Sequence, residues 1–338
     1  MSKLKPFSLP ADLLMGVATA ATQIEGGDTN NSWFEWCEKG HIHDGSTTLR
    51  ANDHWNRWRE DIEIMSQLGL ETARLGVEWS RIEPENGRFD NSVIARYRNE
   101  LELMREKGIV PLVTLHHFTN PLWFEKIGAF QCEASVDIFR RFVNYTASQL
   151  GDLCSDYITI NEPNVYGTMG YFFGEWPPGE KNLTATLKVF KNLTLCHLHS
   201  YLDIHALYKE KFPGRVPRVG FANHLRVFEP MRKNNVADKV GAVVLSKLFQ
   251  DLLTEGMLTG MLKYPIGSGA PLGKGVFGDF IGINYYTRSA VRGFQNGTFN
   301  NVPKNDLGWE IYPKGLADIM KSQHEKYKLP VWITENGT

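Results

Sequence analysis

The sequence has no excess of charge of either sign. Its 338 residues include 37 Lys and Arg against 38 Asp and Glu, so the formal net charge is −1. A nucleic-acid partner would call for clustered positive charge that neutralises phosphates. We therefore expect no nucleic-acid binding.

Cysteines are few, and long apolar runs are missing. The four cysteines form no Cys-x-x-Cys pair, which favours free buried thiols over disulfides or a thiolate metal site. The N-terminal residues lack the apolar segment of a secretion signal, and no run reaches the roughly 18 apolar residues that span a bilayer. These absences predict a soluble, cytoplasmic protein that does not insert into a membrane. The cysteines are Cys37, Cys132, Cys154 and Cys196.

Signatures of a metal or a dinucleotide are also missing. His197 and His199 are two residues apart, so on a helix they point to different faces and make poor joint ligands. No Gly-x-Gly-x-x-Gly opens a helix after an apolar strand, which disfavours a dinucleotide-binding sheet. We expect neither a metal nor an organic cofactor.

What the sequence does contain is a regular alternation of apolar strands and amphipathic helices. Each expected strand is a nearly continuous apolar run, which is typical of a parallel sheet covered by helices. The expected strands are 13–20, 72–79, 109–116, 157–161, 218–227, 280–285 and 331–334. The expected helical segments are 53–68, 91–107, 133–150, 184–212, 235–263 and 313–327.

This alternation predicts an α/β protein with a (β/α)8 TIM barrel in one domain over residues 1–338. Only seven strands are identifiable, so we expect the final strand and helix to be absent from these residues. Unpaired sheet edges are templates for pairing with another chain. We therefore expect exposed edges on the first and last strands, with self-association or recruitment of a complementing C-terminal segment. The polar stretch 293–307 is expected to form a surface hairpin or a lid.

Polar side chains gather where the expected strands end. The site of a (β/α)8 barrel is built at that end by loops and strand-terminal residues. The residues that share this placement are Gln23, Arg74, His116, His117, Asn161, Glu162, Asn223, Asn284, Tyr286 and Glu335. The pattern predicts a small-molecule site at the carboxyl end of the barrel.

Two of these residues are glutamates that follow apolar, β-branched runs. Glu162 ends Tyr-Ile-Thr-Ile-Asn-Glu before a Pro, and Glu335 ends Val-Trp-Ile-Thr-Glu before Asn-Gly. A charge at the end of a buried strand is costly unless it has a partner or a function. Two converging carboxyl groups can cleave a glycosidic bond, with retention when they lie about 5–5.5 Å apart. The alternative is that each glutamate belongs to a separate buried ion pair.

The chemistry assigns different environments to the two carboxyl groups. A nucleophilic Glu335 must stay ionised, and Arg74 is the strongest candidate for a cation beside it. An acidic Glu162 needs a raised pKa, from apolar walls and from the charge of Glu335. Glu25 and Glu78 also lie near strand ends and are rival carboxylates, although Arg81 or a lysine can neutralise them structurally.

Seven motifs in order resemble those of glycoside hydrolase family 1, the retaining β-glycosidases of the β-glucosidase type. They are LLMGVATAATQIEG, DHWNRWREDI, ARLGVEWSRIEP, LHHFTNP, TINEPNV, INYYT and ITENGT. The matches run from residue 13 to residue 338, so the resemblance covers nearly the whole chain. It implies a (β/α)8 barrel that hydrolyses β-linked glycosides without a cofactor.

The resemblance also implies roles for particular residues. Glu162 would be the acid and base, and Glu335 the nucleophile. Arg74 and Tyr286 would hold the nucleophile in its ionised, attacking position. The residues that would line the sugar pocket are Gln23, His117, Asn161 and Asn284, with Phe118 as an apolar wall.

The sequence departs from the family pattern at several positions. Phe118 stands where many members have Trp, Thr119-Asn120 replaces Asp-Leu, and Met15 replaces a Trp. The C-terminal Trp and Glu-Trp of the family's sugar pocket are not in these residues, so the resemblance does not identify the sugar. Two alternatives therefore stay open: a 6-phospho-β-glycosidase, or a non-catalytic barrel fragment that binds a sugar or a partner. Four tryptophans are candidates to line the cleft beyond the first sugar, or are ordinary packing: Trp33, Trp36, Trp176 and Trp309.

Overall fold

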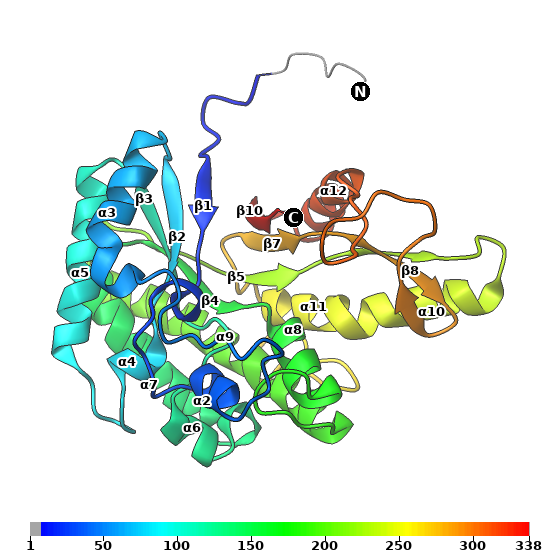
Figure 1. Ribbon diagram of the computed structural model, residues 1–338, viewed down its shortest axis with the longest axis horizontal. Coiled ribbons are helices and arrows are strands. Elements are labelled where there is room, and N and C mark those ends of the chain that lie inside the picture. Colours follow the sequence, from blue (N-terminus) through cyan, green and yellow to red (C-terminus); the bar gives the residue numbers. More distant parts are fainter. Residues whose placement is uncertain (1–7, 338) are drawn as a thin grey trace.

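The computed structural model describes residues 8–337 and shows a seven-stranded, wholly parallel sheet that curls into a nearly closed barrel (Figure 1). The strand order is β1-β2-β3-β4-β5-β7-β10, which follows the chain. The expected fold and the seven expected strands are confirmed. Their bounds are β1 Gly16–Ala18, β2 Thr72–Gly76, β3 Val110–Thr114, β4 Asp156–Asn161, β5 Arg218–His224, β7 Ile281–Tyr285 and β10 Val331–Asn336.

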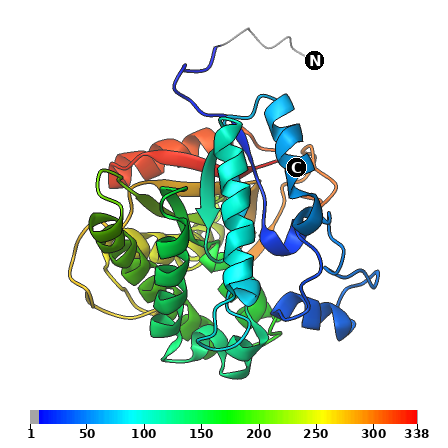
Figure 2. The ribbon, with the colours of Figure 1, turned by 90° about the vertical axis from the view of Figure 1, so that its left-hand side faces the viewer.

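Helices cover the outside of this sheet, and Figure 2 shows α3 and α5 over its first strands. Asp90 caps α5 by accepting from the backbone of Ser92, and Asn182 caps α9 by accepting from Ala185. The longer helices are α3 His54–Gln67, α5 Asn91–Glu106, α7 Ser135–Leu150, α9 Leu183–Lys211, α10 Val236–Ser246, α11 Leu252–Thr259 and α12 Lys314–Tyr327. The short α-helices are α1 Ala21–Ile24, α2 Ser32–Glu38, α4 Trp79–Ile82, α6 Leu122–Lys126 and α8 Pro163–Gly167. There is also a 3₁₀ helix, η1 Ala129–Gln131, and there are two π-helical segments, η2 Thr168–Phe173 and η3 Lys247–Asp251.

A small second sheet packs on α10, away from α3 and α5 (Figure 1). It contains β6 Val227–Pro230, β8 Arg288–Arg292 and β9 Gln295–Gly297. The expected fifth strand, 218–227, was therefore too long: its last residue begins β6, which pairs with β8 rather than with the barrel. Part of the polar stretch 293–307 is the antiparallel β8–β9 hairpin, as expected.

The two outermost strands, β1 and β10, each have one edge unpaired among the described residues, as expected, and apolar side chains in and beside them are exposed as well. Leu14 and Met15, just before β1, are 46% and 54% exposed, Val17 in β1 is 40% exposed, and Ile333 in β10 is 48% exposed. In the described chain, β1 pairs only with β2, and β10 only with β7. Apolar side chains are buried only where a neighbour covers them, so the interpretation of these two apolar runs as buried strands was wrong for the exposed side chains.

The fold also places the cysteines and the first of the two histidines at 197 and 199. All four cysteines are free, although only Cys154 and Cys196 are buried. His197 is a core residue, hydrogen-bonded to Thr159 and to the Phe277 carbonyl. Within residues 8–337, no helix is both long and apolar enough to cross a bilayer, and no three His, Cys, Asp or Glu residues are grouped as a metal site would need.

Candidate active site

The end of β4 delivers two adjacent polar residues into the barrel. The register of β4 against β5 shifts between Ile158 and Asn161, and a shift of this kind re-aims side chains. Glu162 then adopts a left-handed backbone conformation, with φ of 45°, before Pro163 starts α8. This conformation is strained for a residue with a side chain, and such strain gathers at functional sites. Asn161 and Glu162 are both buried at this turn.

The end of β10 presents Glu335 to two donors. A register shift against β7 between Ile333 and Glu335 sets the carboxylate opposite Asn284. Arg74, from β2, donates from Nη2 to Glu335 Oε1 at 2.6 Å. The Tyr286 hydroxyl donates to Oε2. Burial raises the pKa of Tyr286, as do the charges of Glu335 and Glu162, so the phenol keeps its proton and remains a donor.

Amide side chains link the two carboxylates into one site. Asn284 donates from Nδ2 to Glu162 Oε1 at 2.8 Å and to Asn161 Oδ1 at 3.0 Å. Arg74 donates from Nη1 to the same Asn161 oxygen at 3.1 Å, so one cation reaches both halves of the site. The Thr334 hydroxyl donates to Asn284 Oδ1 at 2.6 Å and thereby orients the amide. Glu335 is ion-paired with Arg74 and Glu162 lies beside His224, but the shared amides join both carboxylates in one network.

The two adjacent histidines after β3 have different surroundings. His116 is hydrogen-bonded to Asn120 and packs on aromatic rings, so it belongs to the core. His117 Nε2 lies 3.2 Å from Asn161 Nδ2 and therefore faces the site. Burial lowers the pKa of His117, and the charge of Arg74 lowers it further, so the ring is neutral. His117 Nδ1 and Arg74 Nε are buried without a protein partner.

Two other expected pocket residues are placed less centrally. Gln23 lies on α1 with an exposed side chain, and no hydrogen bond among residues 8–337 joins it to the carboxylates. Phe118 packs edge-on against His117 at 4.7 Å between ring centroids, and against Trp176 at 5.0 Å. Trp176 in turn contacts Trp33. An aromatic wall therefore runs outward from His117.

A hollow lies beside the segments that carry Trp33 and Trp176. Its volume is about 710 Å³, and it is lined by parts of α2, α6 and the segment 174–179. Trp36 lines it, with one face of the indole stacked on His41. Trp309 lies elsewhere, 5.9 Å from the Tyr286 ring. Trp36 and Trp309 therefore border different regions, and the four candidate tryptophans do not form one cleft.

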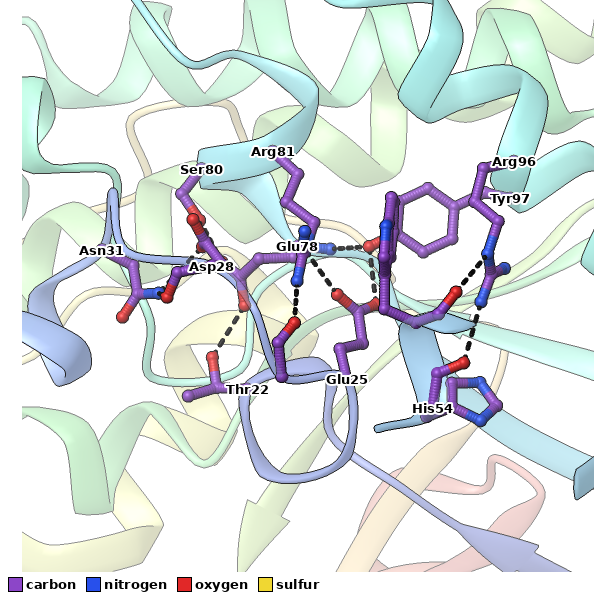
Figure 3. A network of polar contacts seen from close by, with 12 residues as sticks. Thr22, Glu25, Asp28, Asn31, His54, Glu78, Ser80, Arg81, Arg96 and Tyr97 are labelled. Carbon is purple, nitrogen blue, oxygen red and sulfur yellow. Dashed lines mark hydrogen bonds and ion pairs between the residues drawn. The ribbon is translucent and has the colours of Figure 1, made fainter. Parts of the chain in front are cut away.

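The rival carboxylates belong to a separate polar network (Figure 3). Arg81 donates to Glu25 at 2.8 Å, and the Tyr97 hydroxyl donates to the same carboxylate at 2.7 Å. Glu78 accepts from Thr22 at 2.7 Å and from Ser80 at 2.9 Å. Burial, followed by the charges of nearby carboxylates, raises the pKa of Glu78 to about 8. These residues tie the first loop to α4, and neither carboxylate bonds to the pair at Glu162 and Glu335.

The proton affinity of Glu162 differs from the expectation. Burial raises the pKa of Glu162 and is the largest influence, but His224, Asn284 and Arg74 together outweigh it, so the pKa is lowered. His224 Nδ1 lies 3.6 Å from Glu162 Oε1. The expected rise in the pKa of Glu162 was wrong because His224, which lies beside Glu162, was not among the residues expected at the site.

His224 is the site residue that sequence reasoning missed, although alternation along β5 could have found it. Asn223, which was expected to face the site, instead donates to Thr254 of α11. Phe221 packs on His197 of α9. Because side chains alternate along a strand, residues 222 and 224 face the barrel interior. Phe221 packs against a helix, so alternation from Phe221 places Asn223 on the same outer face and His224 on the face that lines the site.

The chain is similar to known proteins over most of its length. A family model described as glycosyl hydrolase family 1 matches residues 5–266. β-Glucosidase A of Acetivibrio thermocellus is 30% identical over all of this chain and 80% of its own length. β-Glucosidase A of Thermotoga maritima is 29% identical over 97% of this chain and 78% of its own.

Solved structures show the same relationship. A β-glycosidase from Pyrococcus horikoshii superposes with a TM-score of 0.86 at 32% identity, over 98% of this chain and 77% of the other. A β-glucosidase from Thermotoga maritima in complex with glucoimidazole superposes with a TM-score of 0.87 at 28% identity, over 97% and 79%. The fold class is the (β/α)8 barrel. The chain belongs to glycosyl hydrolase family 1.

Proposed function

We propose that Glu335 and Glu162 carry out double displacement on β-linked glycosides, Glu335 as the nucleophile and Glu162 as the acid and then the base. Family membership and β-glucosidase relatives at about 29% identity support a retaining β-glycosidase. The residue roles rest on the contacts of the site. Arg74 and Tyr286 act as positioning residues for the nucleophile.

The first step forms one bond and breaks another. A carboxylate oxygen of Glu335 bonds to the anomeric carbon, the glycosidic C–O bond breaks, and the Glu162 proton passes to the leaving oxygen. In the second step a water oxygen bonds to the anomeric carbon while Glu162 takes a water proton. The glycosyl–Glu335 bond breaks as the bond to the water oxygen forms, and both carboxyl groups return to their starting states.

The observation that carries this assignment is the unequal support of the two carboxylates. Each oxygen of Glu335 accepts from one donor, a guanidinium or a phenol, which holds the carboxylate in a fixed orientation. Glu162 instead accepts from the Asn284 amide, which it shares with Asn161, and no arginine or lysine lies at hydrogen-bond distance from it within residues 8–337. Amides and imidazole also suit a sugar, because its ring of hydroxyls both donates and accepts.

The lowered pKa of Glu162 sets the expected pH dependence. Its acid form is populated only as the pH falls toward this lowered value, so kcat/KM should decline as pH rises through it. Glu162 is then already ionised for its role as base in the second step. We expect the optimum on the acid side of neutrality.

The roles are tested with three variants and two aryl β-glucosides, one with a good leaving group and one with a poor one. Glu335→Gln should lose several orders of magnitude in kcat, because an amide cannot act as the nucleophile. Glu162→Ala should slow the substrate with the poor leaving group far more, because only that substrate needs the acid. Glu78→Gln is the control: with a pKa of about 8 the carboxyl is protonated near neutral pH, and an amide resembles it. Equal losses by Glu162→Ala on both substrates, or near-normal turnover by Glu335→Gln, would refute the roles.

Three finer expectations stay predictions. A 6-phospho-β-glycosidase would require phosphorylated substrates to be turned over in preference, so parallel assays with both kinds of substrate separate it from a β-glucosidase. The exposed edges of β1 and β10 support self-association, or pairing with a complementing segment. A cytoplasmic location is likewise a prediction.

A further inference from the structure

An arginine with no acidic partner lies directly behind His224. Arg226 follows β5 and donates to His224 Nε2 from both Nε, at 3.2 Å, and Nη2, at 2.9 Å. Its Nη1 reaches the Ser289 hydroxyl at 3.5 Å. Within residues 8–337, no carboxylate lies within ion-pair distance of Arg226, so its polar partners are neutral. The direct contacts of this half-buried cation are therefore with His224 and Ser289, and the charge of Glu162 acts on it only from a distance.

The contact with Arg226 determines where His224 carries its proton. A guanidinium has donors only, so Nε2 must offer a lone pair to receive two N–H groups. The neutral ring therefore carries its proton on Nδ1. Burial lowers the pKa of His224, and the charge of Arg226 lowers it further, which opposes formation of the imidazolium.

The Nδ1 proton faces one particular oxygen of Glu162. The Nδ1 to Oε1 distance of 3.6 Å is a close electrostatic contact, and catalytic contacts of this kind often shorten when substrate binds. Asn284 donates to the same oxygen at 2.8 Å. In the described chain, the one hydrogen bond that the Glu162 carboxylate accepts is on Oε1, the same oxygen that faces His224, and Oε2 accepts none.

We propose that Arg226 and His224 form a positioning pair that controls the proton of Glu162. Arg226 holds His224 as the neutral Nδ1–H tautomer, and His224 and Asn284 occupy Oε1, which reserves Oε2 for the proton that is transferred. The inference rests on the proposed acid and base role of Glu162. It adds a second arginine to the site, with a function distinct from that of Arg74.

The surroundings of the pair are favourable for this role. The His224 backbone is held by Asn164, whose side chain donates to the His224 carbonyl at 2.8 Å. The ring lies against Tyr286 and Phe249, with centroids 5.4 and 5.8 Å apart, so it has little freedom to turn. The titratable and charged groups that act on the pair are Glu162, Glu335, Tyr285 and Tyr286. Only Glu162 and Glu335 are charged near neutral pH, and Arg74 neutralises Glu335.

The first test does not depend on activity. Nitrogen-15 NMR of the histidine rings distinguishes a protonated nitrogen from one with a free lone pair, and loss of a signal in His224→Asn assigns His224. At pH 7 the expected result is a proton on Nδ1 and none on Nε2. In Arg226→Met the ring should become protonated at higher pH than in the parent. Arg232→Met, which removes an exposed arginine paired with Asp238, is the matched control and should leave the His224 signal unchanged.

The second test uses the alkaline limb of kcat/KM, measured with the poor leaving group. Arg226→Met allows a cation to form beside Glu162, so the limb should move to lower pH by about one unit, the usual effect of an adjacent opposite charge. His224→Leu removes the Nδ1–H donor that faces Glu162, so burial becomes the dominant influence and raises the pKa of Glu162. The alkaline limb should therefore move to higher pH. If Arg226 and His224 had only a structural role, both variants would lower kcat/KM without moving the alkaline limb in opposite directions. Thermal unfolding of each variant shows whether the fold is intact.

The outcomes separate the two claims. An Nε2–H tautomer or an imidazolium at pH 7, or an Arg226→Met spectrum identical to the parent, would overturn the positioning pair. The positioning pair would also be overturned if the alkaline limbs of Arg226→Met and His224→Leu moved in the same direction. A Glu162→Gln variant that retains the alkaline limb would instead refute the role of Glu162, and the NMR result would stand independently.

Discussion

Removing the Tyr286 hydroxyl is the sharpest perturbation of the nucleophile's support. Tyr286→Phe deletes the donor to Glu335 Oε2 and leaves Arg74 on Oε1. A hydrogen bond to a charged group contributes about 1.5–3 kcal/mol. At about 1.36 kcal/mol for each factor of ten in rate, full loss of that contribution slows turnover by about 10- to 150-fold.

The adjacent residue provides a matched control. Tyr285, the last residue of β7, donates its hydroxyl to the Tyr312 carbonyl at 2.6 Å and makes no hydrogen bond to Glu162 or Glu335. Tyr285→Phe should therefore cost about 0.5–1.5 kcal/mol of stability, the net value of a neutral hydrogen bond, and leave kcat unchanged. The assay is steady-state hydrolysis of an aryl β-glucoside, with denaturant unfolding of each variant. A Tyr286→Phe enzyme within twofold of the parent, or an equal loss of kcat in Tyr285→Phe, would refute the reasoning.

Two further predictions concern the fold. Trp79 is 1% exposed and packs on Phe124, Phe139 and Phe142, so Trp79→Ala should cost about 3–5 kcal/mol in denaturant unfolding; a loss below 1 kcal/mol would contradict this packing. Burial lowers the pKa of His54, but Glu100 and Asp61 outweigh burial and the net pKa lies above 6.5. The cation therefore stabilises the fold fully below 6.5, and the benefit is lost as pH rises through the raised value. The destabilisation by His54→Asn should accordingly shrink between pH 6 and pH 9, and a constant difference would disprove the linkage.

The elements that sequence predicted well are those whose signals are local. An apolar β-branched run followed by Pro or Asn-Gly defined the strands that end at Glu162 and Glu335, and the structure has both. Parallel strands place their carboxyl ends together, so Arg74, Asn161 and Asn284 were expected near one another, and their hydrogen bonds show that they are.

What sequence did not predict depends on contacts between distant segments. The exposure of Met15 and Ile333 follows from which strands have neighbours, and hydrophobicity does not report this. The β6–β8–β9 sheet needs pairing between segments that are about 60 residues apart. The lowered pKa of Glu162 comes from His224 on another strand, and Asn223 was expected to face the site in its place. The direction of a pKa shift is set by neighbours in space.

Trapping of the glycosyl intermediate tests the central claim most directly. A 2-deoxy-2-fluoro-β-glucoside with a good leaving group slows both steps by withdrawing electrons from the anomeric carbon, and the good leaving group lets the covalent species accumulate. Peptide mass spectrometry then locates the sugar. We predict one fluoroglucosyl group per chain, attached to Glu335, and none in Glu335→Gln. A label on Glu162 or on any other residue, or complete inactivation without a covalent label, would contradict the assignment of Glu335 as the nucleophile.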